Sequence, residues 1–136
     1  IKQVKSNAKV LSEVLIKNGI DIVTNGTDSH MVLVDLRSKK VTGKDAEESL
    51  ERAGMTCNKN GVSNDPNPPT ITSGIRLGSP AATTRGFKEK EFEFIGENIS
   101  TIINTLSTSN SDISMLEKSI KKEVFDLCQK FPIYKN

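Results

Sequence analysis

The spacing of apolar residues along the chain predicts three long helices. Apolar side chains recur every three or four residues over 1–18, 88–106 and 113–130, which is the period of a helix with one buried face. Gly19 follows the first of these segments and Pro132 follows the last, and both residue types favour a helix end. The sequence therefore predicts one long helix at its start and two at its end.

A fourth and shorter helix is predicted over 42–53, where a capping signal precedes the apolar positions. Thr42 is expected to accept a hydrogen bond from the backbone of Asp45, while the aspartate reaches back to the backbone of the threonine. Gly54 follows as the expected end of this helix. Across the four helices, the side chains expected in the core are Val4, Ala8, Leu11, Leu15, Ala46, Leu50, Ala53, Phe92, Ile95, Ile99, Ile102, Ile103, Leu106, Leu116, Ile120, Val124, Leu127 and Cys128.

Four segments between the helices have the character of strands. Residues 31–36 are rich in apolar and β-branched residues, and 74–78 alternate apolar residues with glycine and arginine. Two further short strands are expected at 20–25 and 55–57. This order of elements predicts an α/β (α+β) fold, in which a small and mostly antiparallel sheet is backed by helices. The Gly-rich loops of nucleotide-binding folds are absent from the sequence.

Composition indicates one domain and argues against several classes of function. The chain has 136 residues, of which 35% are hydrophobic, enough for a single core. Net charge is +2 and aromatic residues are 4%, so no surface for nucleic acid is indicated. No apolar run approaches the roughly 18 residues that cross a bilayer. The chain begins within a predicted helix and without an initiator methionine, so we expect it to be cut from a longer protein.

Few titratable residues have a spacing that suggests catalysis. Cys57 and Cys128 lie far apart and form no CxxC motif, so we expect reduced thiols in a cytosolic protein. His30 is the only histidine and is expected to hold a turn rather than act as a base or metal ligand. Three aspartates stand apart beside turns or strand ends, with no pair spaced for acid–base catalysis: Asp28, Asp35 and Asp65.

Arg76 most needs an explanation, because it interrupts an otherwise apolar strand. Gly74 and Gly78 flank it and leave room for a molecule to approach the backbone. A guanidinium in this setting suits a carboxylate, which it can bind with two parallel hydrogen bonds. A structural ion pair or an exposed position on an edge strand would also explain this arginine, and spacing alone leaves these alternatives open. Arg85 is expected to brace the turn that follows.

A polar stretch at 58–70 precedes the arginine strand. Its thirteen residues include Gly61, Pro66, Pro68 and Pro69, which favour turns over regular structure. Loops of this length in a compact domain tend to be either functional or disordered. We expect this one to be functional.

The segment around Arg76 resembles the signature of a known enzyme family. Residues 71–87 read I-T-S-G-I-R-L-G-S-P-A-A-T-T-R-G-F, which is similar to the T-S-G-I-R-x-G-T/S-P-A-x-T-x-R-G-F motif of the serine hydroxymethyltransferases. Other segments that resemble the family are G-T-D-S-H at 26–30, L-V-D-L at 33–36, N-K-N at 58–60, N-D-P at 64–66 and F-P-I-Y at 131–134. The resemblance covers nearly the whole chain but only the C-terminal third of these enzymes.

This resemblance implies that residues 1–136 form the C-terminal small domain of a fold-type I transferase that depends on pyridoxal phosphate. Such enzymes interconvert serine and glycine and transfer a one-carbon unit to tetrahydrofolate. The resemblance implies that Arg76 binds the α-carboxylate of serine or glycine, and that Asn60 contacts the pterin ring of the folate. It also implies that Pro68, Pro69 and Thr70 line the folate site. Many members have Ser-Pro-Phe there, so in this chain the expected contacts are those of the backbone.

The same resemblance implies no catalytic residue and no metal site in this chain. The lysine that carries pyridoxal phosphate in the family lies in a T-T-T-T-H-K motif, which this sequence lacks, and Lys59 has different neighbours. We therefore expect the cofactor to be held by an absent N-terminal large domain, and the isolated chain to be inactive. The parent is expected to be a cytoplasmic homodimer or dimer of dimers. The alternative is a free-standing anion-binding or interaction module that shares the fold and has no enzymatic activity.

Overall fold

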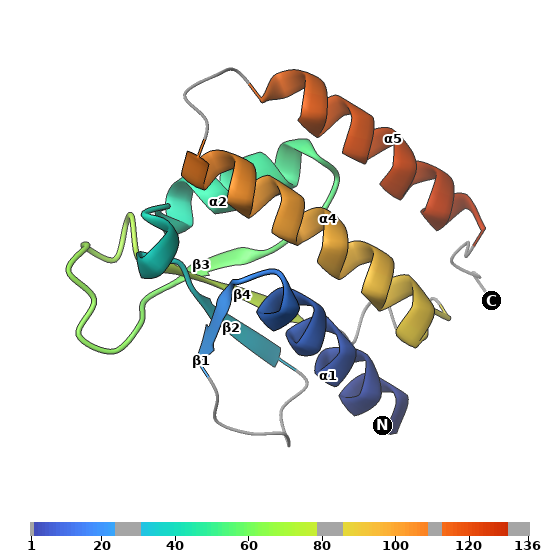
Figure 1. The fold of residues 1–136 in the computed structure, drawn as a ribbon, viewed down its shortest axis with the longest axis horizontal. Coiled ribbons are helices and arrows are strands. Elements are labelled where there is room, and N and C mark those ends of the chain that lie inside the picture. Colours follow the sequence, from blue (N-terminus) through green and yellow to red (C-terminus); the bar gives the residue numbers. More distant parts are fainter. Residues whose placement is uncertain (1, 24–30, 79–85, 109–112, 131–136) are drawn as a thin grey trace.

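Four short strands pair into one antiparallel sheet in a computed structural model of the chain (Figure 1). The structure describes residues 2–23, 31–78, 86–108 and 113–130. The strands are β1 (Asp21–Val23), β2 (Met31–Asp35), β3 (Asn58–Asn60) and β4 (Gly74–Gly78). They lie in the order β1-β2-β4-β3, so β2 and β4 occupy the centre of the sheet.

One face of the sheet is covered and the other is open, because apolar residues alternate along both central strands. Val32 and Val34 of β2, and Ile75 and Leu77 of β4, are each at most 4% exposed. The residues between them on β2 are only half-buried, and Arg76 is exposed. The side chain of Arg76 therefore stands on the open face.

Helices cover the apolar face of the sheet. They are α1 (Lys2–Lys17), α2 (Gly43–Arg52), α4 (Glu89–Thr108) and α5 (Ser114–Gln129), and a short 3₁₀ helix, η1 (Arg37–Lys39), follows β2. Helix α1 contacts β1 and β2, while α2 contacts β3 and β4. Helix α4 contacts both α1 and α2, and α5 lies outermost, beside α2 and α4 (Figure 1). The predicted α+β class is thus confirmed.

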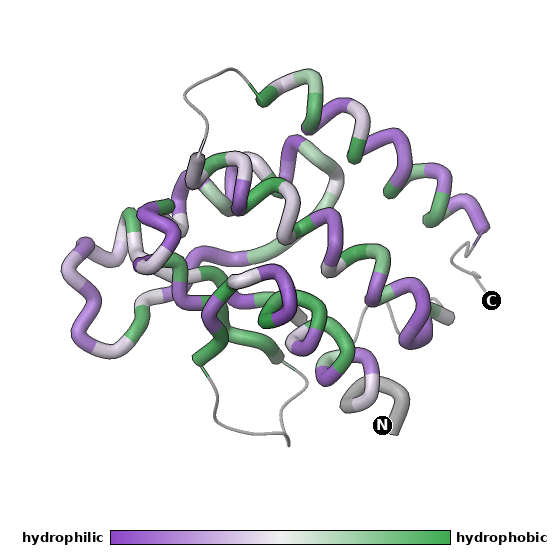
Figure 2. The backbone as a smooth tube through the Cα atoms, in the orientation of Figure 1, coloured by the Kyte–Doolittle hydropathy of each residue, from purple (hydrophilic) through white to green (hydrophobic). Residues whose placement is uncertain are grey.

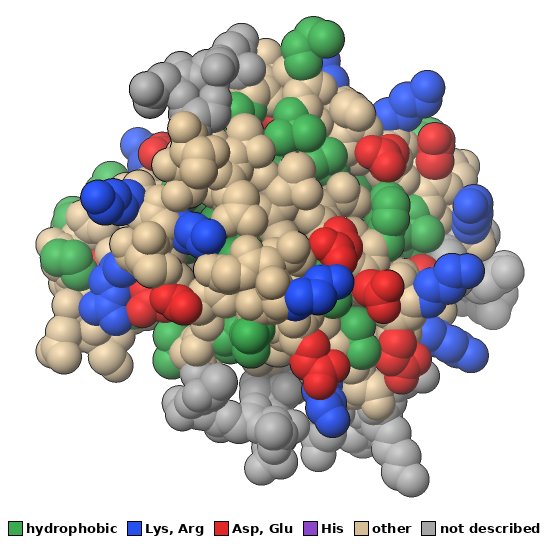
Figure 3. Space-filling view, in the orientation of Figure 1, with side chains coloured by type: hydrophobic (Ala, Val, Ile, Leu, Met, Phe, Trp, Pro, Cys, Tyr) green, Lys and Arg blue, Asp and Glu red, His purple; other side chains and the backbone are tan. Residues whose placement is uncertain are grey.

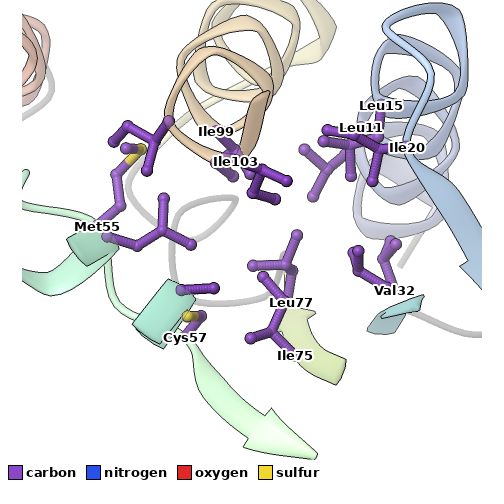
Figure 4. Packing of buried hydrophobic residues seen from close by; sticks show 14 of the residues in the cluster. Leu11, Leu15, Ile20, Val32, Met55, Cys57, Ile75, Leu77, Ile99 and Ile103 are labelled. Carbon is purple, nitrogen blue, oxygen red and sulfur yellow. The ribbon is translucent and has the colours of Figure 1, made fainter. Parts of the chain in front are cut away.

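The apolar stripes predicted for the helices form the core. Apolar positions recur among polar ones along each helix (Figure 2). In Figure 4, Ile99 and Ile103 of α4 and Leu11 of α1 point toward Ile75 and Leu77 of the sheet. Most of the predicted core residues are buried, and five are only partly buried: Ile95, Leu106, Leu116, Leu127 and Cys128. The side chain of Val4 lies outside the described part of the chain.

The third strand does not lie where the sequence predicts it. Residues 55–57 are not a strand, and β3 begins at Asn58 instead. Met55 and Cys57 do alternate inward, each 8% exposed, but the chain reaches hydrogen-bonding distance of β4 only from Asn58 onward. Pairing with β4 therefore overrides the weak strand propensity of Asn-Lys-Asn. Asn60 consequently lies at the end of a strand rather than in the loop.

Half of the predicted capping box forms at the start of α2. The Thr42 hydroxyl accepts a hydrogen bond from the backbone N–H of Asp45 at 3.1 Å. Among the described residues, no reciprocal bond from the Asp45 carboxylate to Thr42 is present. Gly19 and Gly54 follow α1 and α2 with φ values of +83° and +85°, which fit glycine at a helix end.

A buried carboxylate that the sequence pattern does not predict joins α2 to α5. Glu117 of α5 is only 3% exposed. Its carboxylate accepts hydrogen bonds from Arg52 Nε at 2.8 Å, from Arg52 Nη2 at 3.0 Å and from the Ser49 hydroxyl. Ser49 is fully buried, whereas the Arg52 side chain is 58% exposed. These hydrogen bonds therefore join α5 to α2 at a buried position.

Candidate functional site

Arg76 occupies a central strand and is available to a ligand. Strand β4 pairs with β2 on one side and with β3 on the other, so the edge-strand alternative is wrong. The Arg76 side chain is exposed. Within the described ranges, no hydrogen bond or ion pair engages its guanidinium, so the structural ion pair has no partner there. A guanidinium has five N–H donors, and none of those of Arg76 has an acceptor among the described residues.

Strand register brings Arg76 and Asn60 onto the same face. Arg76 lies directly opposite Asn58 of β3, and Gly74 lies directly opposite Asn60. Residues opposite each other in a sheet share a face, so Asn60 lies on the same face as Arg76. It is the diagonal neighbour of Arg76 on the adjacent strand, a relation that typically separates the two Cα atoms by about 7–8 Å. The half-buried Asn60 amide donates to the carbonyl oxygen of Gly61 at 2.9 Å. The two residues that the family resemblance selects are thus brought together by the fold.

Gly74 allows the strands to approach closely beside this pair. A Cβ added at Gly74 would lie 2.7 Å from the Val34 carbonyl oxygen and 2.8 Å from that of Asn60. It would also lie 2.8 Å from the Val62 side chain. The glycine at the start of the arginine strand is therefore required by the packing of backbone on backbone.

The loop at 61–73 is structured, and the first turn of α2 holds one end of it. The first backbone N–H groups of α2 lack partners inside the helix. Here Gly43 N donates to the Thr72 carbonyl oxygen at 3.1 Å, and Lys44 N donates to that of Ile71 at 3.0 Å. A Cβ on Gly43 would collide with the Thr72 hydroxyl and the Gly74 carbonyl oxygen. The loop is therefore seated directly on the helix start.

The segment Pro68–Thr70 forms a tight turn within this loop. The carbonyl oxygen of Pro68 accepts hydrogen bonds from the backbone N–H groups of Ile71 and Thr72, both at 2.9 Å. All three residues of the segment are exposed. The loop leaves the sheet at the end where Asn60 and Gly74 lie, as the yellow-green trace in Figure 1 shows. The structure therefore presents these residues to solvent at that end of the open face.

The carboxylate of Asp65 accepts hydrogen bonds from several separate parts of the loop. It accepts hydrogen bonds from the backbone N–H groups of Val62 at 3.2 Å, Asn67 at 2.9 Å and Ser73 at 2.8 Å, and from the Ser73 hydroxyl at 2.7 Å. These bonds, with the Ser73 hydroxyl first, lower the pKa of Asp65 from 3.8 to about 2. Because the folded pKa is depressed, the associated stability is complete above the ordinary pKa and is lost as pH falls through about 2.

Two further side chains reinforce the loop. The Asn67 amide donates to the Ser73 hydroxyl at 2.8 Å and to the Thr72 carbonyl oxygen at 3.3 Å. Arg37 of η1 donates to the Ser63 carbonyl oxygen at 3.2 Å while its guanidinium forms an ion pair with Asp35 at 2.7 Å. Hydrogen bonding from Arg37 lowers the pKa of Asp35. Asp35 therefore has a structural partner.

Lys59 lies on the other face of the sheet from Arg76. Its register partner is Ile75, which points into the core. The Lys59 ammonium lies 3.4 Å from the carboxylate of Glu47, and the same carboxylate accepts the Lys59 backbone N–H at 2.9 Å. A lysine so engaged cannot reach a ligand held by Arg76. Lys59 is therefore not placed to carry pyridoxal phosphate, which needs a lysine beside the bound amino acid.

Several predicted residues lie outside the described part of the chain. They are His30 and Arg85, together with the segments 26–30 and 131–134 of the family resemblance.

Among the described residues, no group of three or more His, Cys, Asp or Glu side chains could hold a metal ion. None of the described helices is long and apolar enough to span a membrane. On the face shown in Figure 3, acidic and basic side chains are interspersed.

The two cysteines lie away from the open face. Neither forms a disulfide within the described residues, and Cys57 is buried while Cys128 is half-buried. Desolvation, followed by the nearby charges of Glu47 and Glu51, raises the pKa of Cys57 to about 12. Both thiols line an apolar cavity of about 260 Å³ between the helices and the covered side of the sheet. Neither thiol is placed for chemistry beside Arg76.

The sequence pattern does not predict the organising role of Asp65. The sequence signal that was present is the Asn-Asp-Pro turn at 64–66, which favours a side chain bonding its own backbone. Bonds to Ser73, eight residues further on, depend on the path of the loop. Within the described residues, the molecule is therefore an α+β domain that carries an exposed arginine, a nearby amide and a hydrogen-bonded loop on one side of its sheet.

Comparison with known proteins gives this domain a family. A family model described as serine hydroxymethyltransferase matches residues 1–99. Over 133 residues the chain is 57% identical to a serine hydroxymethyltransferase of Paramagnetospirillum magneticum, and over 131 residues it is 56% identical to one of Rhodospirillum centenum. A third, from Ruegeria pomeroyi, is 55% identical over 137 residues. The chain belongs to the serine hydroxymethyltransferase family.

The chain spans only part of these relatives. The matches cover 98%, 96% and 100% of this chain, but 31%, 30% and 32% of the three relatives in the same order. The expected correspondence to about a third of such an enzyme is thus confirmed.

Proposed function

We propose that this chain is the C-terminal small domain of a serine hydroxymethyltransferase that depends on pyridoxal phosphate, and that it binds the α-carboxylate of serine or glycine through Arg76. The single observation that carries the proposal is an exposed guanidinium without a partner among the described residues, on the open face of a central strand. Its planar fork of donors matches the two oxygens of a carboxylate. The parent enzyme would interconvert serine and glycine and pass the one-carbon unit to tetrahydrofolate.

The folate site is proposed to include Asn60 and the turn Pro68–Thr70. Within the described residues, the Asn60 amide oxygen accepts no hydrogen bond, so it can accept one from an amino group of a pterin ring. The exposed turn can offer backbone groups rather than the side chains that many family members have there. The register of β3 with β4 supports one site for folate and amino acid, because it makes Asn60 the diagonal neighbour of Arg76.

Catalysis itself is proposed to depend on the part of the enzyme that this chain does not span. Pyridoxal phosphate supplies the electron sink for bond cleavage at the α-carbon. Lys59, on the covered face and paired with Glu47, offers no suitable amine. We propose a large domain that holds the cofactor, in a cytoplasmic enzyme that works as a homodimer or a dimer of dimers.

The isolated chain should not bind pyridoxal phosphate specifically, because the sequence lacks the lysine motif of the family and Lys59 is paired with Glu47 on the other face of the sheet. Absorbance titration of the chain with the cofactor, followed by borohydride reduction and peptide mapping, measures this. We expect only weak labelling spread over surface lysines such as Lys118 and Lys122. A stoichiometric adduct at one lysine would contradict the assignment of the cofactor site to another domain.

Arg76→Lys in the full-length enzyme should weaken serine and glycine binding by about ten- to a hundredfold. Lysine keeps the charge but loses the fork, and a hydrogen bond to a charged group contributes about 1.5–3 kcal/mol. Calorimetry with serine and glycine measures the affinity, and absorbance measures the retained cofactor, which should hardly change.

Arg85→Lys is the matched comparison, because Arg85 lies in the same family motif and is expected to have a bracing role. Serine affinity should survive that change. If Arg76→Lys bound serine normally while Arg85→Lys did not, the carboxylate site would belong to the other arginine.

A further inference from the structure

Three separate backbone segments converge on the carboxylate of Asp65. It accepts from Val62 at the start of the loop, from Asn67 in the middle and from Ser73 at the end. The Ser73 hydroxyl adds a fourth bond, so both carboxylate oxygens are used. A carboxylate has about four lone-pair sites, and here each has a donor.

Each of these segments leads directly to a residue of the proposed ligand site. Val62 follows Asn60 by two residues, and Asn67 immediately precedes the turn Pro68–Thr70. Ser73 precedes Gly74, the first residue of β4, and the Ser73 carbonyl oxygen accepts the Leu36 N–H at 2.8 Å. Asp65 thus links, by hydrogen bonds, the segment that follows Asn60, the segment that precedes the turn Pro68–Thr70 and the segment that precedes Arg76.

Backbone conformation in the loop gives a second and independent reason for such a tie. Asn64 and Thr72 have φ values of +57° and +60°, in the left-handed region that residues other than glycine rarely adopt. Such conformations cost free energy and persist only when surrounding contacts impose them. Asn64 directly precedes Asp65, and Thr72 directly precedes Ser73. Thr72 keeps its own hydrogen bonds to Pro68, Gly43 and Gly74 without the carboxylate, whereas the segment around Asn64 loses its ties to Val62 and Asn67 and can shift.

We propose that Asp65 is a positioning residue, which sets Asn60, the turn Pro68–Thr70 and Arg76 at the spacing needed to bind folate and amino acid together. The inference rests on the proposed function of this site. Asp65 acts through the loop and carries none of the proposed ligand contacts. Because a displacement of about 1 Å in a binding group can reduce activity on the order of a hundredfold, a loosened loop affects both ligands.

The test is Asp65→Asn in the full-length enzyme, with Asp126→Asn as the matched control. The asparagine keeps the shape of the side chain but replaces one acceptor oxygen with an N–H donor that faces backbone N–H groups. Asp126 is exposed on α5, so its change removes the same charge far from the loop. Calorimetry gives the affinities for glycine and for tetrahydrofolate, and thermal unfolding gives the folded fraction.

We expect Asp65→Asn to weaken both affinities per folded molecule by about ten- to a hundredfold. In steady-state assays the KM for serine and for tetrahydrofolate should rise together, while kcat at saturation should fall much less. Cofactor content should stay the same. Asp126→Asn should match the unmodified enzyme in all of these measurements.

Ser73→Ala is a milder second variant in case Asp65→Asn does not fold. It removes one of the four bonds to the carboxylate and leaves the three backbone bonds in place. The KM values should rise in the same direction by a smaller factor. Unchanged KM values in both variants, or a lower unfolding temperature with unchanged affinities, would overturn the positioning role.

The outcome for Arg76→Lys separates this inference from the proposed function. If Arg76→Lys weakens serine binding while Asp65→Asn and Ser73→Ala leave both affinities unchanged, the proposed function stands and the positioning role fails. If Arg76→Lys leaves serine binding unchanged, the proposed function fails, and the inference that rests on it fails as well.

Discussion

Ile99→Ala should lower the free energy of unfolding by about 2–5 kcal/mol, the cost of the lost apolar transfer plus the space that remains. Ile99 is 3% exposed and lies between α4 and the sheet (Figure 4). It also lines the cavity of about 260 Å³, so truncation enlarges an existing space instead of creating one that neighbours can fill. Denaturant titration of the purified chain measures the change.

Glu93→Ala is the control for this helix, because Glu93 is exposed on α4. Its effect should stay within about 0.5 kcal/mol, as for most surface substitutions. Equal and small effects of Ile99→Ala and Glu93→Ala would mean that α4 buries a different face.

Arg52→Ala should lower the free energy of unfolding by about 3 kcal/mol, because it removes the guanidinium that donates two hydrogen bonds to the buried carboxylate of Glu117. This is the lower end of the usual range for broken buried pairs, since the Arg52 side chain is 58% exposed and Ser49 remains as a donor. Denaturant titration again measures the effect. Adding Glu117→Gln to Arg52→Ala should recover part of the loss, because the amide carries no charge. No recovery would mean that the buried charge is not the cause.

The helices and most of the core could be predicted from the sequence, because both depend on local period. Leu11, Leu50, Ile102 and Ile120 are buried as their spacing predicts. The strand at Asn58–Asn60 could not be predicted from the sequence, because its residues have weak strand propensity and the strand forms only by pairing with β4. A local pattern favoured 55–57 instead, where the side chains alternate but the backbone has no partner strand.

The candidate site was predictable in part. Arg76 and Asn60 were selected by their family motif, and the register of β3 with β4 shows that they share a face. The hydrogen bonds that fix the loop beside the site, and those that join α2 to α5, were not predictable, because they join residues that no local pattern relates. Ser73 meets Asp65 across a loop, and Glu117 meets Ser49 from 68 positions away.

Helix α2 is hydrogen-bonded at both of its ends, so it rigidly connects α5 to the loop at 61–73. Its first turn holds Ile71 and Thr72 through backbone N–H groups, and its last turns hold Glu117 of α5. Ten residues of helix are about 15 Å long and bend little. A substitution on α5 that shifts α2 along its axis would therefore also shift the loop at 61–73, although no residue of that loop has changed.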